Sequence, residues 1–310
     1  MPYSLTRLNE AVRSDPGAFA RECDAAFAKK VENAASRIAE HRRESRVILL
    51  SGPSGSGKTT TALKIEERLR NMGIETHTIS MDNYFNTIDP ETAPRNREGA
   101  IDYESPFCLD IDLLNRHFAM LDRGETIHVP KYEFARQMRS DIMSQPMRLG
   151  PDELAIFEGI HALNDVIIGK NPQAFKLYIA ARSNVVDEDG SVVFYHHWLR
   201  LCRRIVRDYK FRGSNAEFTL KLWPNVRRGE KLYISPYKEN ANLKFDSSLA
   251  TEVCVMKPYI VPLLQELPRG EYPDADAILA AYERIEALDE SLIPADSLIR
   301  EFIGGGSFSY

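Results

Sequence analysis

The chain has 310 residues and a formal net charge of −5, with 43% hydrophobic and 27% charged residues. This length allows one large α/β domain with appendages, and the composition is that of a globular protein with a sizeable core. The acidic balance argues against a general affinity for nucleic acids or anionic membranes, and no apolar run is long enough to span a membrane. The four cysteines are far apart, which excludes CxxC-type zinc and redox sites. With no signal-peptide core at the N-terminus, they predict reduced thiols and a cytoplasmic protein.

Predicted helices and strands alternate along the chain. Residues 1–45 predict two helices, broken near Asp15-Pro16-Gly17. Apolar and amphipathic runs then predict strands at 46–50, 75–80, 154–158 and 176–180 and helices at 58–72, 109–122, 195–211 and 248–266. The tail at 274–303 is predicted to be helical, and the final residues, IGGGSFSY, to be loose. This alternation is typical of an α/β fold with a mainly parallel sheet covered by helices on both faces.

The segment SGPSGSGKTT, residues 51–60, lies between a predicted strand and a predicted helix and matches G-x-x-x-x-G-K-[ST]. Glycines here let successive N–H groups point at an anion, and the helix that follows presents its positive end. In this motif the lysine reaches the β- and γ-phosphates and the hydroxyl ligates Mg²⁺. A chance match is expected in about one chain in a hundred of this length. We therefore expect ATP and Mg²⁺ to be bound by Gly52, Ser54, Gly55, Ser56, Gly57, Lys58, Thr59 and Thr60.

A phosphate loop alone does not separate a GTPase, a motor ATPase and a small-molecule kinase. The sequence has no NKxD-type guanine-reading stretch. Asp82, in SMDNYF after the second predicted strand, would project towards the phosphates and accept the proton of an attacking hydroxyl, or hold Mg²⁺. Taken alone, Asp82 could equally be a residue that only caps a turn. Glu158 ends the apolar strand LAIFE, a Walker-B-like position that steadies the metal, although acids are common at strand ends.

The segment YHHWLRLCRRIVRDYKFRG, residues 195–213, predicts an amphipathic helix with one apolar stripe. The opposite side carries a row of arginines, namely Arg200, Arg203, Arg204 and Arg207, with Arg212 just beyond. A solvated basic face is the simpler interpretation of such a row. In an acidic chain with a phosphate loop we favour a lid, over about 195–228, whose arginines stabilise a transferring phosphoryl group.

These motifs occur together in a known family. The sequence resembles the uridine kinase and phosphoribulokinase family over about 46–265 in the order and spacing of GPSGSGKTT, SMDNYF, IDYESP, PKYEFARQMR, FEGIHAL and RRIVRDYKFRG. The sequence from WPNVRRGEKLY to REFIGGGSF is similar to a bacterial branch of uridine kinase-like nucleoside kinases. Its members often carry a threonyl-tRNA-synthetase-like N-terminal extension, which we expect to be absent here. The resemblance implies a P-loop NTPase-type three-layer fold, with a helical N-terminal extension at 1–45, a kinase domain at 46–266 and a helical C-terminal tail at 267–310.

The resemblance also implies a role for individual residues. Asp82 would be the base for the acceptor hydroxyl, and Thr59 and Glu158 would serve Mg²⁺. The groups acting on the phosphates would be Lys58, Arg207 and Arg212. The acceptor would be held by Tyr84, Asp102, Tyr132, Phe134, Gln137, Arg139 and Arg204, with Asp102 on the ribose hydroxyls and Arg204 close to it.

Three departures from the family pattern concern the acceptor. Uridine–cytidine kinases have a pyrimidine-contacting histidine where this chain has Gln137, and a second lid arginine where it has Ser214. The order Tyr84-Phe85 is also inverted. We expect an ATP- and Mg²⁺-dependent kinase of a primary hydroxyl, first of all the 5′-OH of a uridine- or cytidine-like ribonucleoside. The family tendency adds a homo-oligomer as a further expectation.

Two alternatives stay open at this point. The acceptor could be another alcohol or a sugar phosphate, as in phosphoribulokinase or pantothenate kinase; the basic residues available for a phosphorylated acceptor are Arg95, Arg97, Arg136 and Arg139. The protein could instead be a nucleotide-binding regulator whose kinase activity has lapsed. The complete set of phosphate-loop, acidic and lid residues favours the kinase.

Overall fold

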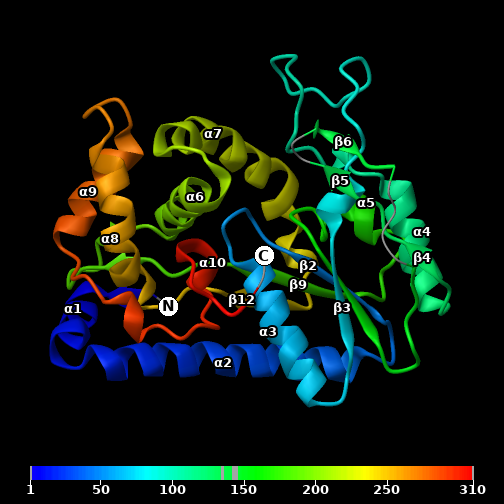
Figure 1. The fold of residues 1–310 in the computed structure, drawn as a ribbon, viewed down its shortest axis with the longest axis horizontal. Coiled ribbons are helices and arrows are strands. Elements are labelled where there is room, and N and C mark those ends of the chain that lie inside the picture. The colour runs from blue at the N-terminus through cyan, green and yellow to red at the C-terminus, as the bar shows by residue number, and fades with distance from the viewer. Residues whose placement is uncertain (1, 134–135, 142–145, 309–310) are drawn as a thin grey trace.

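The computed structural model describes residues 2–133, 136–141 and 146–308, and Figure 1 shows their arrangement. The helices of the N-terminal half are α1 (Leu5–Ser14), α2 (Pro16–His41), α3 (Lys58–Asn71), α4 (Ile111–Asp122) and α5 (Asp165–Ile168). The helices of the C-terminal half are α6 (His196–Arg212), α7 (Ala216–Gly229), α8 (Glu252–Gln265), α9 (Pro273–Glu283) and α10 (Arg300–Ile303). Among the described residues, no helix is long and apolar enough to cross a membrane.

The main sheet has five strands, all parallel, in the order β12-β9-β2-β8-β3. In that order their bounds are Leu243–Asp246, Phe175–Ala180, Val47–Ser51, Leu154–Glu158 and Thr76–Ser80. The central strand β2 is buried along its whole length, as expected where helices cover both faces of a parallel sheet. The short strands outside this sheet are β1 (Tyr3–Ser4), β4 (Ile127–His128), β5 (Tyr132–Glu133), β6 (Met138–Arg139), β7 (Pro146–Met147), β10 (Val185–Val186) and β11 (Val192–Phe194).

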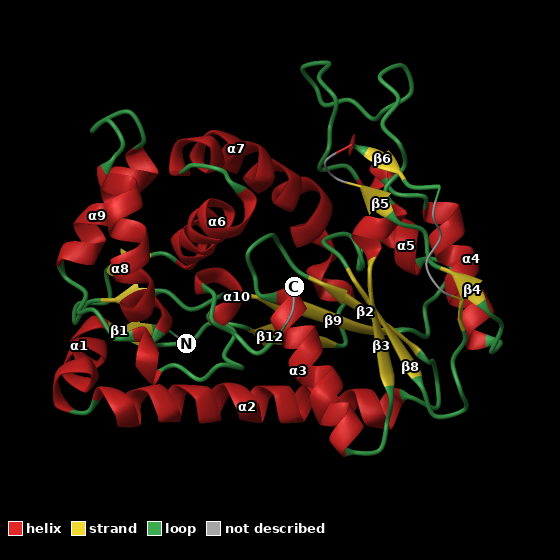
Figure 2. Cartoon of the chain, in the orientation of Figure 1, coloured by secondary structure: helices red, strands yellow, loops and turns green. Residues whose placement is uncertain are grey.

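Alternate side chains of β2 enter two separate hydrophobic clusters. Ile48 and Leu50 join the cluster that contains α2, α3, α6 and α8. Val47 and Leu49 join the cluster on the other face, with α4 and α5. Figure 2 shows the sheet between these two helical layers. The three-layer α/β fold predicted from the sequence is therefore confirmed.

The chain before and after the sheet packs into the first of these clusters. The long helix α2 lies along the base of the molecule in Figure 1, and its Phe27 shares that cluster with Phe302 of α10. Its start follows the sequence signals: Asp15 accepts a hydrogen bond from the Ala18 N–H at 2.8 Å, and Pro16 takes the first helical position. The predicted break between two N-terminal helices is confirmed. The division into domains at residues 45 and 266 stays a prediction.

Four parts of the chain differ from the sequence-based expectation. Helix α7 was not predicted because it contains Pro224, which disfavours a helix interior. Strand β12 was missed because its sequence, LKFD, lacks the continuous apolar run of a buried parallel strand. The expected helical tail is interrupted after α9 and resumes only as a 3₁₀ turn (Glu290–Leu292) and α10. Residues 304–308 are also not loose as expected, since the Ser307 N–H donates to the Ala295 carbonyl at 2.8 Å.

Candidate active site at the phosphate loop

The loop between β2 and α3 requires its glycines. A Cβ at Gly52 would lie 1.9 Å from the Ile179 carbonyl oxygen, and one at Gly57 would lie 2.6 Å from Leu298 Cδ1. Gly55 and Gly57 also have φ angles of 73° and 78°, in the left-handed region that favours glycine. The residue before α3, Gly57, has no side chain with which to cap the helix. The loop therefore brings bare backbone and the positive end of a helix to one place, the arrangement that binds phosphate.

Two arginines of α6 hold this loop from outside. Arg200 Nε donates to the Ser54 carbonyl and Arg203 Nη1 donates to the Gly55 carbonyl, both at 3.0 Å. Both side chains are buried and ion-paired, Arg200 with Glu230 and Arg203 with Glu252. Arg200 and Arg203 therefore do not face the phosphates as lid groups. Buried cations need such partners, and these two brace the outer side of the loop.

Lys58, Asp82 and Glu158 form the charged centre beside the loop. Burial lowers the pKa of the Lys58 ammonium, and the negative charges of Glu158 and Asp82 oppose that shift. Protein atoms crowd both carboxylates and raise the pKa of each, while the Lys58 charge lowers it. Asp82 remains accessible to solvent. The turn that carries it (Met81–Tyr84) is capped by the Ser80 hydroxyl, so the Asp82 carboxylate is not used as the cap.

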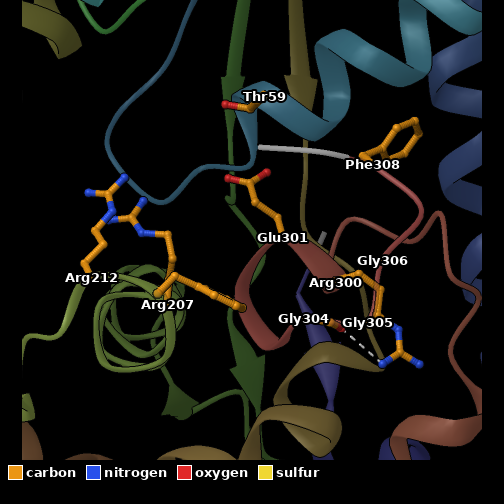
Figure 3. A pocket seen from close by; sticks show the side chains of 10 residues that line it. Thr59, Arg207, Arg212, Arg300, Glu301, Gly304, Gly305, Gly306 and Phe308 are labelled. Atoms are coloured by element: carbon orange, nitrogen blue, oxygen red, sulfur yellow. Dashed lines mark hydrogen bonds between the residues drawn. The ribbon is translucent and has the colours of Figure 1, made fainter. Parts of the chain in front are cut away.

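Arg204, Arg207 and Arg212 have side-chain partners. Arg204 Nη1 donates to Ser54 Oγ at 2.6 Å. Arg207 is bonded to Asp208 through Nε and Nη2, at 2.9 and 2.7 Å. Arg212 is more exposed, and its Nε lies 3.6 Å from the Asp208 carboxylate. Its positive charge lowers the pKa of Asp82. Arg207 and Arg212 line a pocket of about 530 Å³ together with Thr59 (Figure 3).

Glu301 of α10 reaches the same place and was missed by the sequence analysis. Its Oε2 accepts the Thr60 backbone N–H at 3.2 Å and the Thr60 hydroxyl at 2.5 Å. Figure 3 shows its carboxylate directed towards the start of α3, below Thr59. No local motif around REFI indicates this contact, because it joins residues 241 positions apart.

A second pocket, of about 220 Å³, lies at the end of the turn that carries Asp82. It is lined by Phe85, Ile88, Tyr103, Cys108, Tyr132 and Gln137. The rings of Phe85 and Tyr132 are 5.5 Å apart. Tyr132 and Gln137, two of the residues expected to contact the acceptor, both line this pocket; their contact with an acceptor stays a prediction. Phe134 lies outside the described residues.

Two residues expected to contact the acceptor do not line this pocket. Tyr84 is fully buried, and its hydroxyl is 2.8 Å from His117 Nδ1. Arg139 bonds to Asp110 at 3.0 Å and to the carbonyls of Tyr84 and Phe85 at 3.1 and 3.3 Å. Neither side chain reaches the pocket, and it is the neighbouring Phe85 that lines it. Tyr84 and Phe85 are adjacent at the end of one turn, and their side chains point in different directions. The Tyr84 side chain is buried in the apolar core, and the Phe85 side chain lines the pocket.

Asp102 also differs from its expected role. It is 1% exposed and accepts two hydrogen bonds from Arg228, at 2.6 and 3.1 Å, and one from the Tyr233 hydroxyl at 2.8 Å. Burial alone would raise the pKa of Asp102, but these hydrogen bonds outweigh it and hold that pKa below its usual value. Its cationic partner is therefore Arg228 and not Arg204. Arg228 and Tyr233 come from the end of α7 and the turn after it, which no motif in the sequence had singled out.

The comparison with known families is consistent with this geometry. Residues 47–253 match the family model described as "Phosphoribulokinase / Uridine kinase family". The chain belongs to this family. A uridine kinase of Staphylococcus aureus (strain JH9) is 29% identical over 210 residues, which is 67% of this chain and 91% of that protein.

Solved structures with similar folds include other kinases. A D-glycerate 3-kinase from Cryptococcus neoformans is 16% identical, with a TM-score of 0.42 over 67% of this chain and 87% of that one. A phosphoribulokinase from Rhodobacter spheroides is 16% identical, with a TM-score of 0.40 over 66% and 74%. The family match ends at residue 253, so α9, α10 and the segment after them lie beyond it.

Kinases of the phosphoribulokinase and uridine kinase family use ATP with Mg²⁺, and the residues present fit both. The glycine cradle and the positive N-terminal end of α3 are suited to the phosphates. The buried Ser56 hydroxyl has no hydrogen-bond partner among the described residues. For Mg²⁺ the chain offers the Thr59 hydroxyl and the Glu158 carboxylate, and this ion is commonly held by one or two protein oxygens together with nucleotide phosphates.

Proposed function

We propose that this kinase transfers the γ-phosphate of ATP to a primary hydroxyl of a small acceptor, and that the acceptor is a ribonucleoside phosphorylated on its 5′-OH. One observation carries the proposal. The turn after β3 (Met81–Tyr84) carries Asp82, which faces the charges of Lys58 and Arg212, and is followed by Phe85, which lines the aromatic pocket. A hydroxyl attached to a ring bound in that pocket would meet a carboxylate beside the phosphate site.

Different residues have different roles in the phosphoryl transfer. The loop and Lys58 hold the β- and γ-phosphates, and bound Mg²⁺ would neutralise charge on them. Asp82 orients the acceptor hydroxyl and takes its proton, and its raised pKa makes it a stronger base than a free aspartate. Arg207 and Arg212 stabilise charge that develops on the transferring group.

The pocket favours an uncharged acceptor with a flat ring. Among the described residues its lining is aromatic and apolar, with the Gln137 amide as a polar group and no basic side chain. Of the four arginines available for a sugar phosphate, three have protein partners: Arg95, Arg136 and Arg139. Arg95 donates to the carbonyls of Gly99 and Pro90, and Arg136 pairs with Glu133. Tyr132 and Phe85 offer ring faces, and the amide of Gln137 can hydrogen-bond the edge of a pyrimidine or a purine.

The test is ADP release with ATP and Mg²⁺ across ribonucleosides, deoxyribonucleosides, pantothenate and ribulose 5-phosphate. We expect release that depends on one or a few ribonucleosides. If ADP is released only with pantothenate or only with ribulose 5-phosphate, that compound is the acceptor and the nucleoside proposal is wrong. Equal background release with every compound, in a protein that binds ATP tightly, would support the lapsed regulator instead.

A further inference from the structure

The pocket of about 530 Å³ beside the phosphate loop has one wall that lies outside the family match. That wall is the last part of the predicted C-terminal tail, residues 300–308, which is called the tail from here on. Gly304 and Phe308 of this segment both line the pocket. The opposite wall is the end of α6, with Phe211 and Arg212, and the inner end is Thr59 of the phosphate loop. In Figure 3, Arg207 and Arg212 lie on one side of Glu301 and Phe308 lies on the other.

The tail is anchored firmly enough to serve as a wall. Phe302 and Ile303 are buried in the core. Arg300 donates to the carbonyls of Glu290 and Ile293, at 2.7 and 2.9 Å. From the other side, Lys210 of α6 donates to the Ile303 carbonyl at 2.5 Å. These contacts hold the three glycines that follow against the end of α6.

The two walls suit a flat ring. Phe211 lies in the exposed last turn of α6 and is itself 56% exposed, and a Cβ at Gly304 would lie 3.1 Å from its ring. Gly304 and Gly305 have φ angles of 86° and 70°, so other residues would be strained there. The result is a bare backbone beside an accessible aromatic face. Nucleic-acid bases of any sequence stack on such faces.

The charged side chains of the pocket are unevenly placed. Arg207 and Arg212 lie on one side of Glu301, whereas the part of the lining formed by Gly304–Gly306 and Phe308 holds one charged group, Arg300, which is bonded to the carbonyls of Glu290, Ile293 and Gly304. A nucleotide has the same polarity, with phosphates at one end and an uncharged ring at the other. Because Thr59 belongs both to the pocket and to the phosphate loop, one extended ligand can occupy both.

We propose that the tail and Phe211 form the binding site for the base of the phosphate donor, an adenine-type purine ring stacked on Phe211. The tail is then a component of the donor site supplied from beyond the family's common core. This inference rests on the proposed function, because it takes the loop to be the site of the donor's phosphates.

The test compares ATP with tripolyphosphate, which has the phosphates without the base. Binding of each to the full chain is measured by calorimetry for the unmodified protein, Phe211→Ala and Phe308→Ala. The matched control is Phe218→Ala, which removes an equally exposed ring (54%) from α7, away from the pocket. We expect ATP to bind at least about tenfold more tightly than tripolyphosphate, and Phe211→Ala to weaken ATP roughly tenfold without changing tripolyphosphate binding. Phe308→Ala should act in the same direction, and Phe218→Ala should change neither ligand.

Two results would overturn the inference while leaving the phosphate site intact. One is unchanged ATP affinity in both Phe211→Ala and Phe308→Ala with normal tripolyphosphate binding. The other is equal loss of both ligands, which would indicate a general disturbance of the loop. If neither ATP nor tripolyphosphate binds the unmodified protein, the proposed kinase function itself fails, and the base site with it.

Discussion

The Glu301 carboxylate accepts both the backbone N–H and the hydroxyl of Thr60, at 3.2 and 2.5 Å. Thr60 lies in the first turn of α3, where free N–H groups and the helix dipole attract an anion. A carboxylate from the tail therefore lies where it competes electrostatically with nucleotide phosphate. It also acts on Lys58: burial lowers the pKa of that ammonium, and the Glu301 charge opposes the shift.

The first prediction is that Glu301→Gln strengthens phosphate binding. Glutamine keeps a carbonyl oxygen to accept from Thr60 but removes one negative charge next to the phosphate site. A unit charge a few ångströms away in a solvated site is worth about 1 kcal/mol, so tripolyphosphate affinity should rise about fivefold at low salt. Calorimetry measures this, with exposed Glu283→Gln on α9 as control. Weaker binding in Glu301→Gln would mean that the carboxylate assists the ligand.

The second prediction concerns Asp82 as the base. Asp82→Asn should lower turnover by about 10²–10⁴ and leave ATP affinity nearly unchanged, because the amide cannot take the acceptor's proton. ADP release and calorimetry measure the two effects. Asp112→Asn on α4, whose side chain is 90% exposed, is the control and should behave as the unmodified protein. Near-normal turnover in Asp82→Asn would remove Asp82 from the mechanism.

The third prediction separates arginines that support the loop from arginines that act on phosphate. Arg203→Gln leaves Glu252 buried without its cation, so the free energy of unfolding should fall by about 3–5 kcal/mol. Arg207→Gln should change stability little, since Asp208 keeps Arg212 at 3.6 Å, but should lower turnover about 10²-fold. Urea unfolding and ADP release distinguish the two. A stable, inactive Arg203→Gln would contradict the supporting role.

The fourth prediction is a pH dependence set by Glu104. Burial raises the pKa of its carboxyl to about 7, and the nearby Asp102 adds to that shift, while Arg204 and Arg228 oppose it. Because the folded pKa is the higher one, folding favours the protonated form. The stabilisation is present below the unfolded pKa of about 4.3 and is lost as the pH rises to about 7.

Unfolding titrations between pH 4 and 8 measure this effect. The unmodified protein should lose about 2–3 kcal/mol of stability over that range from this group, and Glu104→Gln should not. The amide stands for the protonated carboxyl and carries no titrating charge. Identical pH profiles for the two proteins would show that Glu104 remains ionised in the fold.

The sequence determined those features that depend on short-range chemistry. The phosphate loop was identified because glycines, lysine and threonine must occur at fixed spacing between a strand and a helix. The break at Asp15-Pro16 followed from a capping side chain and a proline next to each other. The order of motifs then sufficed to predict both the family and the three-layer fold.

Only the tertiary structure decided how groups that are distant in the chain pair with each other. Helical spacing placed Arg203 and Arg207 on the same side of α6, but packing buried the first against the loop and left the second beside a pocket. The partner of Asp102 lies 126 positions away, at Arg228, and that of Thr60 lies 241 positions away. Such pairings depend on which apolar faces pack together, and no local pattern of residues encodes that choice.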